Sequence, residues 1–180
     1  MHEKQTLHEG KWVRLVKQGQ WEFCERTNVS GIVGIIAVTA DDHIILNQQF
    51  RPPVNCDMIE LPAGLVGDEA GREDEPLREG ARRELEEETG YHAGSMKRVA
   101  VGAPSAGICD EIITFYLATD LDKVSDGGGD DHEDITVHRV PLAGIEDWLN
   151  AKSDEGLLID LKVYLALYFA CQHVANKSRS

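Results

Sequence analysis

The feature that most limits the possible folds is a nearly continuous apolar run at residues 31–39, GIVGIIAVT. Its length and its isoleucine and valine content predict a strand buried in the protein interior. A turn at residues 41–43 and a returning strand at residues 43–50 complete a predicted hairpin. Residues 51–53, Arg-Pro-Pro, end this second strand because proline lacks the N–H group that pairs strands. A buried sheet is therefore expected.

The other predicted elements alternate between strands and helices without a regular repeat. Two short strands are expected within residues 11–26, on either side of a turn at residues 17–20. Further strands are expected at residues 58–62, 99–102, 111–119 and 135–140. Helices are expected at residues 76–89, 141–150 and 155–174, and loops at residues 64–74 and 126–131. This order predicts an α/β or α+β fold with a mixed sheet between helices, preceded by a small antiparallel N-terminal lobe.

The helix predicted between Pro76 and Gly90 carries three carboxylates on one face. Glu84, Glu87 and Glu88 stand at positions i, i+3 and i+4, which share one side of a helix. Like charges at this spacing repel one another, and hard oxygen ligands of this kind suit Mg2+ or Mn2+. On spacing alone, a metal site and a solvated acidic surface helix both remain open.

The charge balance restricts the expected partners. The chain has 32 Asp and Glu against 18 Lys and Arg, which gives a net charge of −14. Nucleic acids and anionic membranes attract basic surfaces, so neither is an expected partner. An anionic substrate would need local positive charge, which divalent cations held by carboxylates could provide.

The cysteines and the apolar segments favour a cytoplasmic protein. The four cysteines are Cys24, Cys56, Cys109 and Cys171. They form no C-x-x-C pair, which favours isolated reduced thiols. Residues 1–10 lack the apolar segment of a secretory signal, and the apolar stretch at residues 157–170 is too short to span a bilayer.

The wider pattern around the carboxylates resembles the Nudix box, G-x5-E-x7-R-E-U-x-E-E-x-G-U, where U is a hydrophobic residue. The matching positions are Glu75, Arg83, Glu84, Leu85, Glu87, Glu88, Gly90 and Tyr91. The box usually opens at the glycine of a Pro-Ala-Gly turn, which here is Gly64. Ten residues rather than five separate Gly64 from Glu75, so the loop at residues 65–74 is five residues longer than the pattern.

Segments outside the box look like the ADP-ribose (ADP-sugar) pyrophosphatase branch of this family. They are residues 10–12, 21–22 and 26, residues 49–53, residues 59–64 and residues 104–111. The resemblance implies a Nudix-type α/β/α sandwich and Mg2+-dependent hydrolysis of the diphosphate bond of ADP-ribose or a related nucleoside diphosphate sugar. It further implies an N-terminal lobe at residues 1–30 for dimerisation and base binding, and a hydrolase domain at residues 31–180.

The resemblance assigns four metal ligands. They are the backbone carbonyl of Ala63 and the side chains of Glu84, Glu87 and Glu88. The expected cofactor is Mg2+, with Mn2+ possible because it accepts the same hard oxygen ligands. Arg83 is expected to orient these carboxylates through ion pairs, as residues that contact metal ligands commonly do.

Glu133 is the expected general base. It follows the glycine-rich segment 127–129, and a loop of that kind can close over a bound substrate. In similar enzymes a glutamate on this loop orients or deprotonates the attacking water. The alternatives are that Glu133 is a solvated acid and that Glu87 or Glu88 is the base.

The resemblance also assigns the residues that bind substrate. They are Trp12, Trp21, Glu22, Arg26, Arg51, Glu60, Ser105 and Gly107. Trp12 and Trp21 are expected to stack on adenine, with one ring supplied by the partner subunit of a homodimer whose N-terminal segments are swapped. Arg51 is expected at the diphosphate or terminal ribose, or else in a structural ion pair. Glu60 is expected to pair with an arginine or to bind ribose hydroxyls.

Three alternative functions remain open. The same chemistry would serve GDP-mannose, another nucleoside diphosphate sugar or an oxidised nucleoside diphosphate. A non-catalytic nucleotide-binding module is less expected, because the glutamates of the box are intact. The last alternative is a structural acidic helix without a metal.

Overall fold

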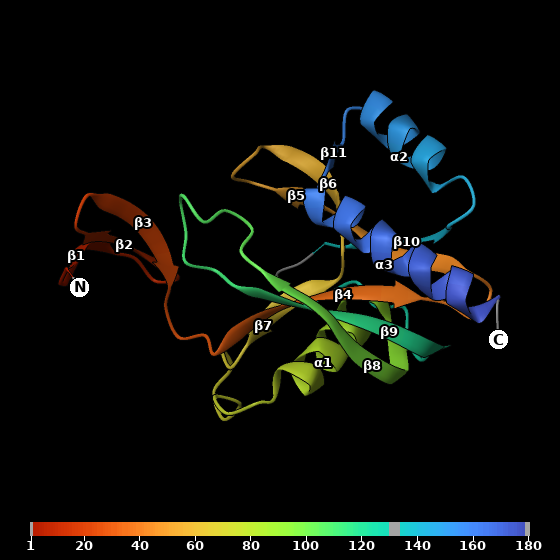
Figure 1. Ribbon diagram of the computed structural model, residues 1–180, viewed down its shortest axis with the longest axis horizontal. Coiled ribbons are helices and arrows are strands. Elements are labelled where there is room, and N and C mark those ends of the chain that lie inside the picture. The colour runs from red at the N-terminus through yellow and green to blue at the C-terminus, as the bar shows by residue number, and fades with distance from the viewer. Residues whose placement is uncertain (1, 130–133, 179–180) are drawn as a thin grey trace.

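The computed structural model describes residues 2–129 and 134–178. Within these residues, a small sheet and a large sheet contain eleven strands, and three helices accompany them (Figure 1). Together they confirm the predicted mixed α/β fold with an antiparallel N-terminal sheet. None of the helices in the described part of the chain is long and apolar enough to cross a membrane.

The small sheet consists of three antiparallel strands, β1 (Lys4–Glu9), β2 (Val13–Gln18) and β3 (Trp21–Arg26). The β2–β3 hairpin was predicted, and Gly19, with a φ of 63°, makes its turn. Strand β1 was not predicted, because its sequence KQTLHE is polar and exposed throughout. Figure 1 shows this sheet at one end of the molecule, beside the loop that follows β8.

The large sheet has the order β11-β6-β5-β4-β9-β8, with β10 paired to β5 and β7 paired to β4. Its strands are β4 (Gly31–Val38), β5 (His43–Arg51), β6 (Cys56–Glu60), β7 (Ala63–Val66), β8 (Tyr91–Gly102), β9 (Ile113–Lys123), β10 (Thr136–Pro141) and β11 (Leu158–Ile159). The β4–β9 and β6–β11 pairs are parallel and the other pairs are antiparallel. The sheet is therefore mixed, as predicted.

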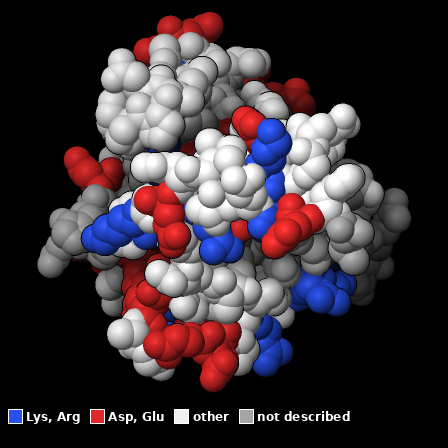
Figure 2. All heavy atoms as spheres, turned by 90° about the vertical axis from the view of Figure 1, so that its left-hand side faces the viewer, with Lys and Arg blue, Asp and Glu red and all other residues white. Residues whose placement is uncertain are grey.

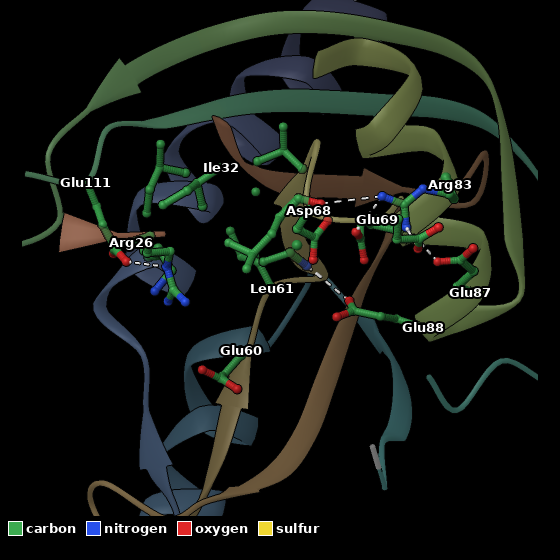
Figure 3. A pocket seen from close by; sticks show the side chains of 18 of the residues that line it. Arg26, Ile32, Glu60, Leu61, Asp68, Glu69, Arg83, Glu87, Glu88 and Glu111 are labelled. Atoms are coloured by element: carbon green, nitrogen blue, oxygen red, sulfur yellow. Dashed lines mark hydrogen bonds and ion pairs between the residues drawn. The ribbon is translucent and has the colours of Figure 1, made fainter. Parts of the chain in front are cut away.

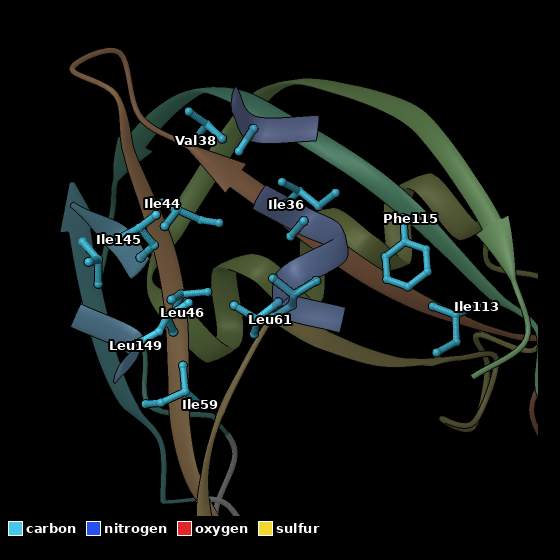
Figure 4. Packing of buried hydrophobic residues seen from close by; sticks show 14 residues of the cluster. Ile36, Val38, Ile44, Leu46, Ile59, Leu61, Ile113, Phe115, Ile145 and Leu149 are labelled. Carbon is cyan, nitrogen blue, oxygen red and sulfur yellow. The ribbon is translucent and has the colours of Figure 1, made fainter. Parts of the chain in front are cut away.

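Strand β4 is apolar on both faces because helices cover both faces of the sheet. One face packs against α1 (Leu77–Thr89), where Ile35 lies in the same cluster as Leu85. The other face packs against α2 (Ile145–Asp154) and α3 (Leu161–Lys177), where Ile36 shares a cluster with Leu149 and Val163 (Figure 4). All five residues are at most 1% exposed. The continuous apolar run thus produces a three-layer arrangement.

Two helices begin later than predicted, and one predicted loop is partly a strand. Pro141 remains in β10, and α2 starts after Gly144, which has a φ of 84°. Helix α3 starts after Asp160, whose side chain accepts a hydrogen bond from the N–H of Lys162 at 2.7 Å. Strand β7 occupies the start of the predicted loop because it pairs with β4, a long-range contact that local composition does not reveal.

Candidate active site

Helix α1 presents its acidic face to a cavity at the edge of the large sheet. Buried Ala81 and Leu85, on an adjoining side of the helix, anchor it on the sheet. Gly90 ends the helix in the left-handed conformation, with a φ of 72°, and its N–H donates to the carbonyl of Glu86 at 2.8 Å. With this anchoring, three glutamates of the helix line the cavity: Glu84, Glu87 and Glu88.

The cavity has a volume of about 480 Å3, and both acidic and basic side chains line it. Figure 3 shows Arg83, Glu87 and Glu88 on one side, with Arg26 and Glu111 on the other. The remaining polar lining residues are Arg51, Glu60, Asp68, Glu69, Glu84 and Lys162. Acidic groups therefore gather at the helix, while basic groups also face the same space.

Arg83 holds a network of carboxylates together. Its Nη1 atom lies 2.8 Å from Oε2 of Glu87 and 3.5 Å from Oε1 of Glu69. Its Nη2 atom lies 2.9 Å from Oε1 of Glu84 and 3.3 Å from Oε2 of Glu75. Burial alone would lower the pKa of Arg83, but these carboxylates outweigh burial and raise it. Arg83 therefore stays charged and offsets the repulsion within the acidic cluster.

Glu84 is partly buried against strand β7. Its carboxyl group packs against Gly64, where a Cβ atom would overlap it. Burial raises the pKa of Glu84 to about 7, while Arg83 opposes this shift and the charge of Glu87 adds to it. The lack of a side chain at Gly64 thus provides the space for a buried carboxylate in the cavity.

Among the described residues, two neutral groups donate to one oxygen of Glu88. Its Oε2 atom accepts hydrogen bonds from Nδ2 of Asn47 at 2.8 Å and from the backbone N–H of Ala63 at 3.0 Å. Only 4% of Glu88 is exposed. Strands β5 and β7 therefore fix one carboxylate oxygen of helix α1 from two directions.

The donor set suits a hard cation. Within the described residues, no three His, Cys, Asp or Glu side chains converge into a ready-made metal cluster. Mg2+ does not require such a cluster, because it is commonly bound by one or two carboxylates together with waters and substrate phosphates. Glu84, Glu87, Glu88 and the carbonyl of Ala63 could supply oxygen ligands from one wall of the cavity.

Two further ion pairs line the cavity away from helix α1. Nε of Arg51 donates to Oε2 of Glu60 at 2.7 Å, and Nε of Arg26 donates to Oε1 of Glu111 at 2.6 Å. Burial raises the pKa of Glu60, against the opposing effect of Arg51. Lys162 also lines this part of the cavity. Several cationic groups therefore face the same space as the helix carboxylates.

Five of the predicted substrate-binding residues do not line this cavity. Trp21 and Gly107 lie together at a second cavity of about 230 Å3, which Phe23 and Cys109 also line. Trp12 and Trp21 are 66% and 58% exposed. Glu22 and Ser105 complete the five. The carboxylate of Glu22 lies 3.8 Å from Nζ of Lys17, and the carbonyl of Ser105 accepts a hydrogen bond from the N–H of Ile108 at 3.0 Å. Glu133 lies outside the described residues.

The sequence prediction missed several residues of the main cavity. They are Asn47, which contacts Glu88, and the lining residues Asp68, Glu69, Glu111 and Lys162. The sequence does not single out Asn47, because the next two residues, Gln48 and Gln49, are also amides. Asp68 and Glu69 belong to the lengthened loop, and only the fold shows that this loop turns toward the cavity.

The end of the molecule that carries the N-terminal sheet has a mixed charge distribution. Figure 2 views this end and shows basic and acidic side chains interspersed over it. A protein that binds nucleic acid without sequence specificity neutralises many phosphates with grouped basic side chains. The visible face offers this mixed pattern instead.

Comparison with known proteins gives a consistent set of relatives. A family model described as the NUDIX domain matches residues 30–161. A methanol dehydrogenase activator from Bacillus methanolicus is 36% identical over 158 residues, which cover 86% of this chain and 82% of that protein. An ADP-ribose pyrophosphatase from Bacillus subtilis (strain 168) is 38% identical over 113 residues, which cover 62% of this chain and 58% of that protein. A crystal structure of an ADP compounds hydrolase shares the fold, with a TM-score of 0.70 and 20% identity over 99% of this chain and 95% of that one.

Proposed function

This chain belongs to the Nudix domain family, and from that membership we propose that it is a pyrophosphohydrolase. Its proposed reaction is the Mg2+-dependent cleavage of the diphosphate bond in ADP-ribose or a related nucleoside diphosphate sugar. The products are a nucleoside monophosphate and a sugar phosphate. The name of the Bacillus subtilis relative, an ADP-ribose pyrophosphatase, supports this substrate class.

One observation carries the proposal: a single cavity joins the glutamates of α1 to several cationic side chains. Glu84, Glu87 and Glu88 line one side, and Arg26 and Arg51 line the same space (Figure 3). The diphosphate of a nucleoside diphosphate sugar carries negative charge on both phosphoryl groups. A cation and basic donors are therefore both needed to neutralise it. Arg26 and Arg51 each have a carboxylate partner that could turn to ribose hydroxyls when the guanidinium binds phosphate.

The metal site would be formed by the side chains of Glu84, Glu87 and Glu88 and by the carbonyl of Ala63. A bound Mg2+ would neutralise charge on the diphosphate and lower the pKa of a coordinated water. Arg83 orients Glu84 and Glu87 through its two Nη atoms. The same wall of the cavity therefore supplies both the ligands and the group that keeps them in place.

The proposed general base is Glu133, which would accept a proton from the attacking water. The loop that leads to it is anchored at the end of α1. The N–H of Gly128 donates to the carbonyl of Glu88 at 2.8 Å, and the N–H of Gly129 donates to the carbonyl of Glu87 at 3.2 Å. This anchoring brings the described end of the loop next to the carboxylate helix, which supports the assignment. Glu87 and Glu88 are the alternative bases.

The positions of the tryptophans support a homodimer with swapped N-terminal segments. Trp12 lies opposite Thr27, because the N–H of Thr27 donates to the carbonyl of Trp12. Thr27 follows Trp21 by six residues, so the two tryptophans are six residues apart along the hairpin. Six residues of a strand span about 20 Å, which is too far for both rings to stack on one base. If both rings bind the same adenine, one must come from a second chain. Residues 1–30 would then be the dimerisation and base-binding lobe, and residues 31–180 the hydrolase domain.

We also propose that the protein works in the cytoplasm. All four cysteines are unpaired thiols: Cys24, Cys56, Cys109 and Cys171. Free thiols are the usual state in a reducing compartment. The small anionic substrate proposed here would be met in the same compartment.

Product analysis tests the proposed function. ADP-ribose, GDP-mannose and an oxidised nucleoside diphosphate are incubated with Mg2+ in 18O-labelled water, and the products are identified by mass spectrometry. We expect AMP and ribose 5-phosphate from ADP-ribose, with 18O in one of them. Glu88→Gln should lower turnover by more than about 100-fold, while Glu86→Gln, on the solvent side of the same helix, should not. Absence of hydrolysis across the panel, or near wild-type turnover in Glu88→Gln, would refute the proposal.

A further inference from the structure

Asn47 is a buried amide of the large sheet, directly after the apolar stretch of β5. On β5 it follows the fully buried Ile45 and Leu46, and it has no exposed surface of its own. It lies opposite Val137 of β10 on one side and Glu60 of β6 on the other. Burial of an amide costs free energy that only a hydrogen bond can offset. An asparagine at this position therefore needs a specific polar partner.

The partner of Asn47 is a carboxylate of helix α1. Its Nδ2 atom donates to Oε2 of Glu88 at 2.8 Å, and the N–H of Ala63 donates to the same oxygen at 3.0 Å. The two donors come from β5 and β7, which belong to the rigid sheet. A carboxylate oxygen held by two donors from fixed elements has a defined orientation.

The donors of Glu88 differ in charge from those of its neighbours on the helix. Glu84 and Glu87 both lie within 3 Å of the guanidinium of Arg83, which supplies positive charge. The amide of Asn47 is neutral, so its hydrogen bond orients Glu88 without adding a charged group at this oxygen. Asn47 and the N–H of Ala63 thus fix the position of one oxygen of Glu88.

The second polar atom of Asn47 argues against a purely structural role. Its Oδ1 atom is buried and has no hydrogen-bond partner among the described residues. An unsatisfied buried acceptor lowers stability, and an apolar residue of similar size would avoid that loss. Local features that oppose stability are typical of functional sites.

We propose that Asn47 is a positioning residue of the metal site, which holds the carboxyl group of Glu88 in the orientation that a divalent cation requires. This inference rests on the proposed function, because it assumes that Glu88 is a metal ligand. Asn47 is proposed to bind neither substrate nor cation itself. It acts through Glu88.

The test compares two substitutions in neighbouring residues of β5. Asn47→Leu removes the hydrogen bond to Glu88 and keeps a similar volume, with Asn47→Val as a second variant. Gln48→Leu is the matched control, because it removes an amide that contacts Nε2 of His138 at 2.9 Å instead of a metal ligand. Mn2+ binding is measured by calorimetry on substrate-free protein, and melting temperatures are measured in EDTA.

We expect Asn47→Leu to weaken Mn2+ binding by about 10- to 100-fold. Its melting temperature in EDTA should stay within about 4 °C of the wild type. Saturating Mg2+ should restore most of its turnover, and Gln48→Leu should bind Mn2+ like the wild type. Wild-type Mn2+ affinity in Asn47→Leu, or equal losses in the Asn47 and Gln48 variants, would overturn the proposal. Loss of the fold in both Asn47 variants would also overturn it, because Asn47 would then be structural.

The same experiment separates this inference from the proposed function. Wild-type protein that neither binds Mn2+ nor hydrolyses any substrate of the panel would refute the proposed function and the role of Asn47 with it. Wild-type protein that does both, while Asn47→Leu is unaffected, would refute the role of Asn47 alone.

Discussion

Gly64 packs directly against the carboxyl group of Glu84, so that a Cβ atom at residue 64 would overlap the carboxyl carbon and both oxygens. The φ angle of Gly64 is not in the left-handed region, so close approach alone requires glycine here. Strand β7 and helix α1 thus meet at a point where one added methyl group must move a proposed metal ligand.

Gly64→Ala should therefore weaken metal binding with little effect on the fold. The displaced Glu84 carboxylate would lose its orientation, and we expect the Mg2+ concentration for half-maximal activity to rise by about 10- to 100-fold. The measurement is a Mg2+ titration of hydrolysis. Gly102→Ala is the matched control, because a Cβ at residue 102 meets nothing within 4 Å. An unchanged Mg2+ requirement in Gly64→Ala would remove Glu84 from the ligand set.

Substitution of Arg83 should destabilise the protein, and Mg2+ should relieve part of the loss. Only 14% of the Arg83 side chain is exposed, and four carboxylates surround it. Arg83→Met leaves these carboxylates without their counter-charge, so we expect the free energy of unfolding in EDTA to fall by about 3 kcal/mol. The measurement is denaturant unfolding in EDTA and in excess Mg2+, where a bound cation would replace part of the missing charge.

Arg78→Met provides the control for this prediction. Arg78 is exposed and pairs with Glu79 at 3.2 Å, so its substitution should change the free energy of unfolding by less than about 0.5 kcal/mol. If Arg83→Met lowered the free energy of unfolding equally with and without Mg2+, the carboxylates around Arg83 would not bind a common cation.

Local sequence was sufficient to predict the framework around the site. The apolar run in β4 predicted a buried strand, because an element buried on both faces has no polar positions to expose. The helix was predicted from its composition and from Gly90, whose positive φ ends it. Both features are patterns within a short stretch of neighbouring residues, which the sequence displays directly.

Contacts that depend on strand register could not be predicted in the same way. The hydrogen bond between Asn47 and Glu88 joins β5 to α1. An arginine partner was one of two roles expected for Glu60, but only the pairing of β5 with β6 shows that Arg51 is this partner. Which residues face one another depends on how the strands align, and a shift of one residue would turn each side chain to the other face. Strand β1 escaped prediction for a related reason, since its polar sequence becomes a strand only by pairing with β2.

The stability of the N-terminal sheet should depend on pH through the ionisation of Glu25. This residue is 3% exposed, and its carboxylate pairs with Lys4 of β1 and with Nε of Arg14 at 2.7 Å. The hydrogen bond from Lys4, followed by that from Arg14, lowers the pKa of Glu25 against the effect of burial. Because the pKa of Glu25 is lower in the folded state, these pairs stabilise the protein fully at pH values above the pKa of Glu25 in the unfolded chain. Their contribution disappears as pH falls through the folded-state pKa.

Glu25→Gln should therefore lose stability at neutral pH and approach the wild type in acid. We expect a loss of about 1–3 kcal/mol above about pH 5, since two charged hydrogen bonds are removed. The measurement is the free energy of unfolding between pH 7 and pH 3. Glu22→Gln is the control on the same strand, because its exposed pair with Lys17 should contribute little. If the free energy of unfolding differed by the same amount between Glu25→Gln and wild type at every pH in this range, the prediction would be wrong.

The two tryptophans allow a direct test of a base site shared between chains. Trp12→Ala and Trp21→Ala should each raise the KM for ADP-ribose by about tenfold, because base stacking contributes about 1–3 kcal/mol. Neither should change the KM for a small diphosphate without a base. Trp21→Phe keeps an aromatic ring and should retain most of the affinity.

When the two alanine variants are unfolded together and refolded as a mixture, half of the dimers should contain one chain of each kind. If each base site takes Trp12 from one chain and Trp21 from the other, one site of every mixed dimer regains both rings. About a quarter of all sites should then bind ADP-ribose with wild-type KM. If both rings belonged to one chain, no site of the mixture would be intact and the KM would stay high. Steady-state kinetics of the mixture, compared with each variant refolded alone, distinguishes these outcomes.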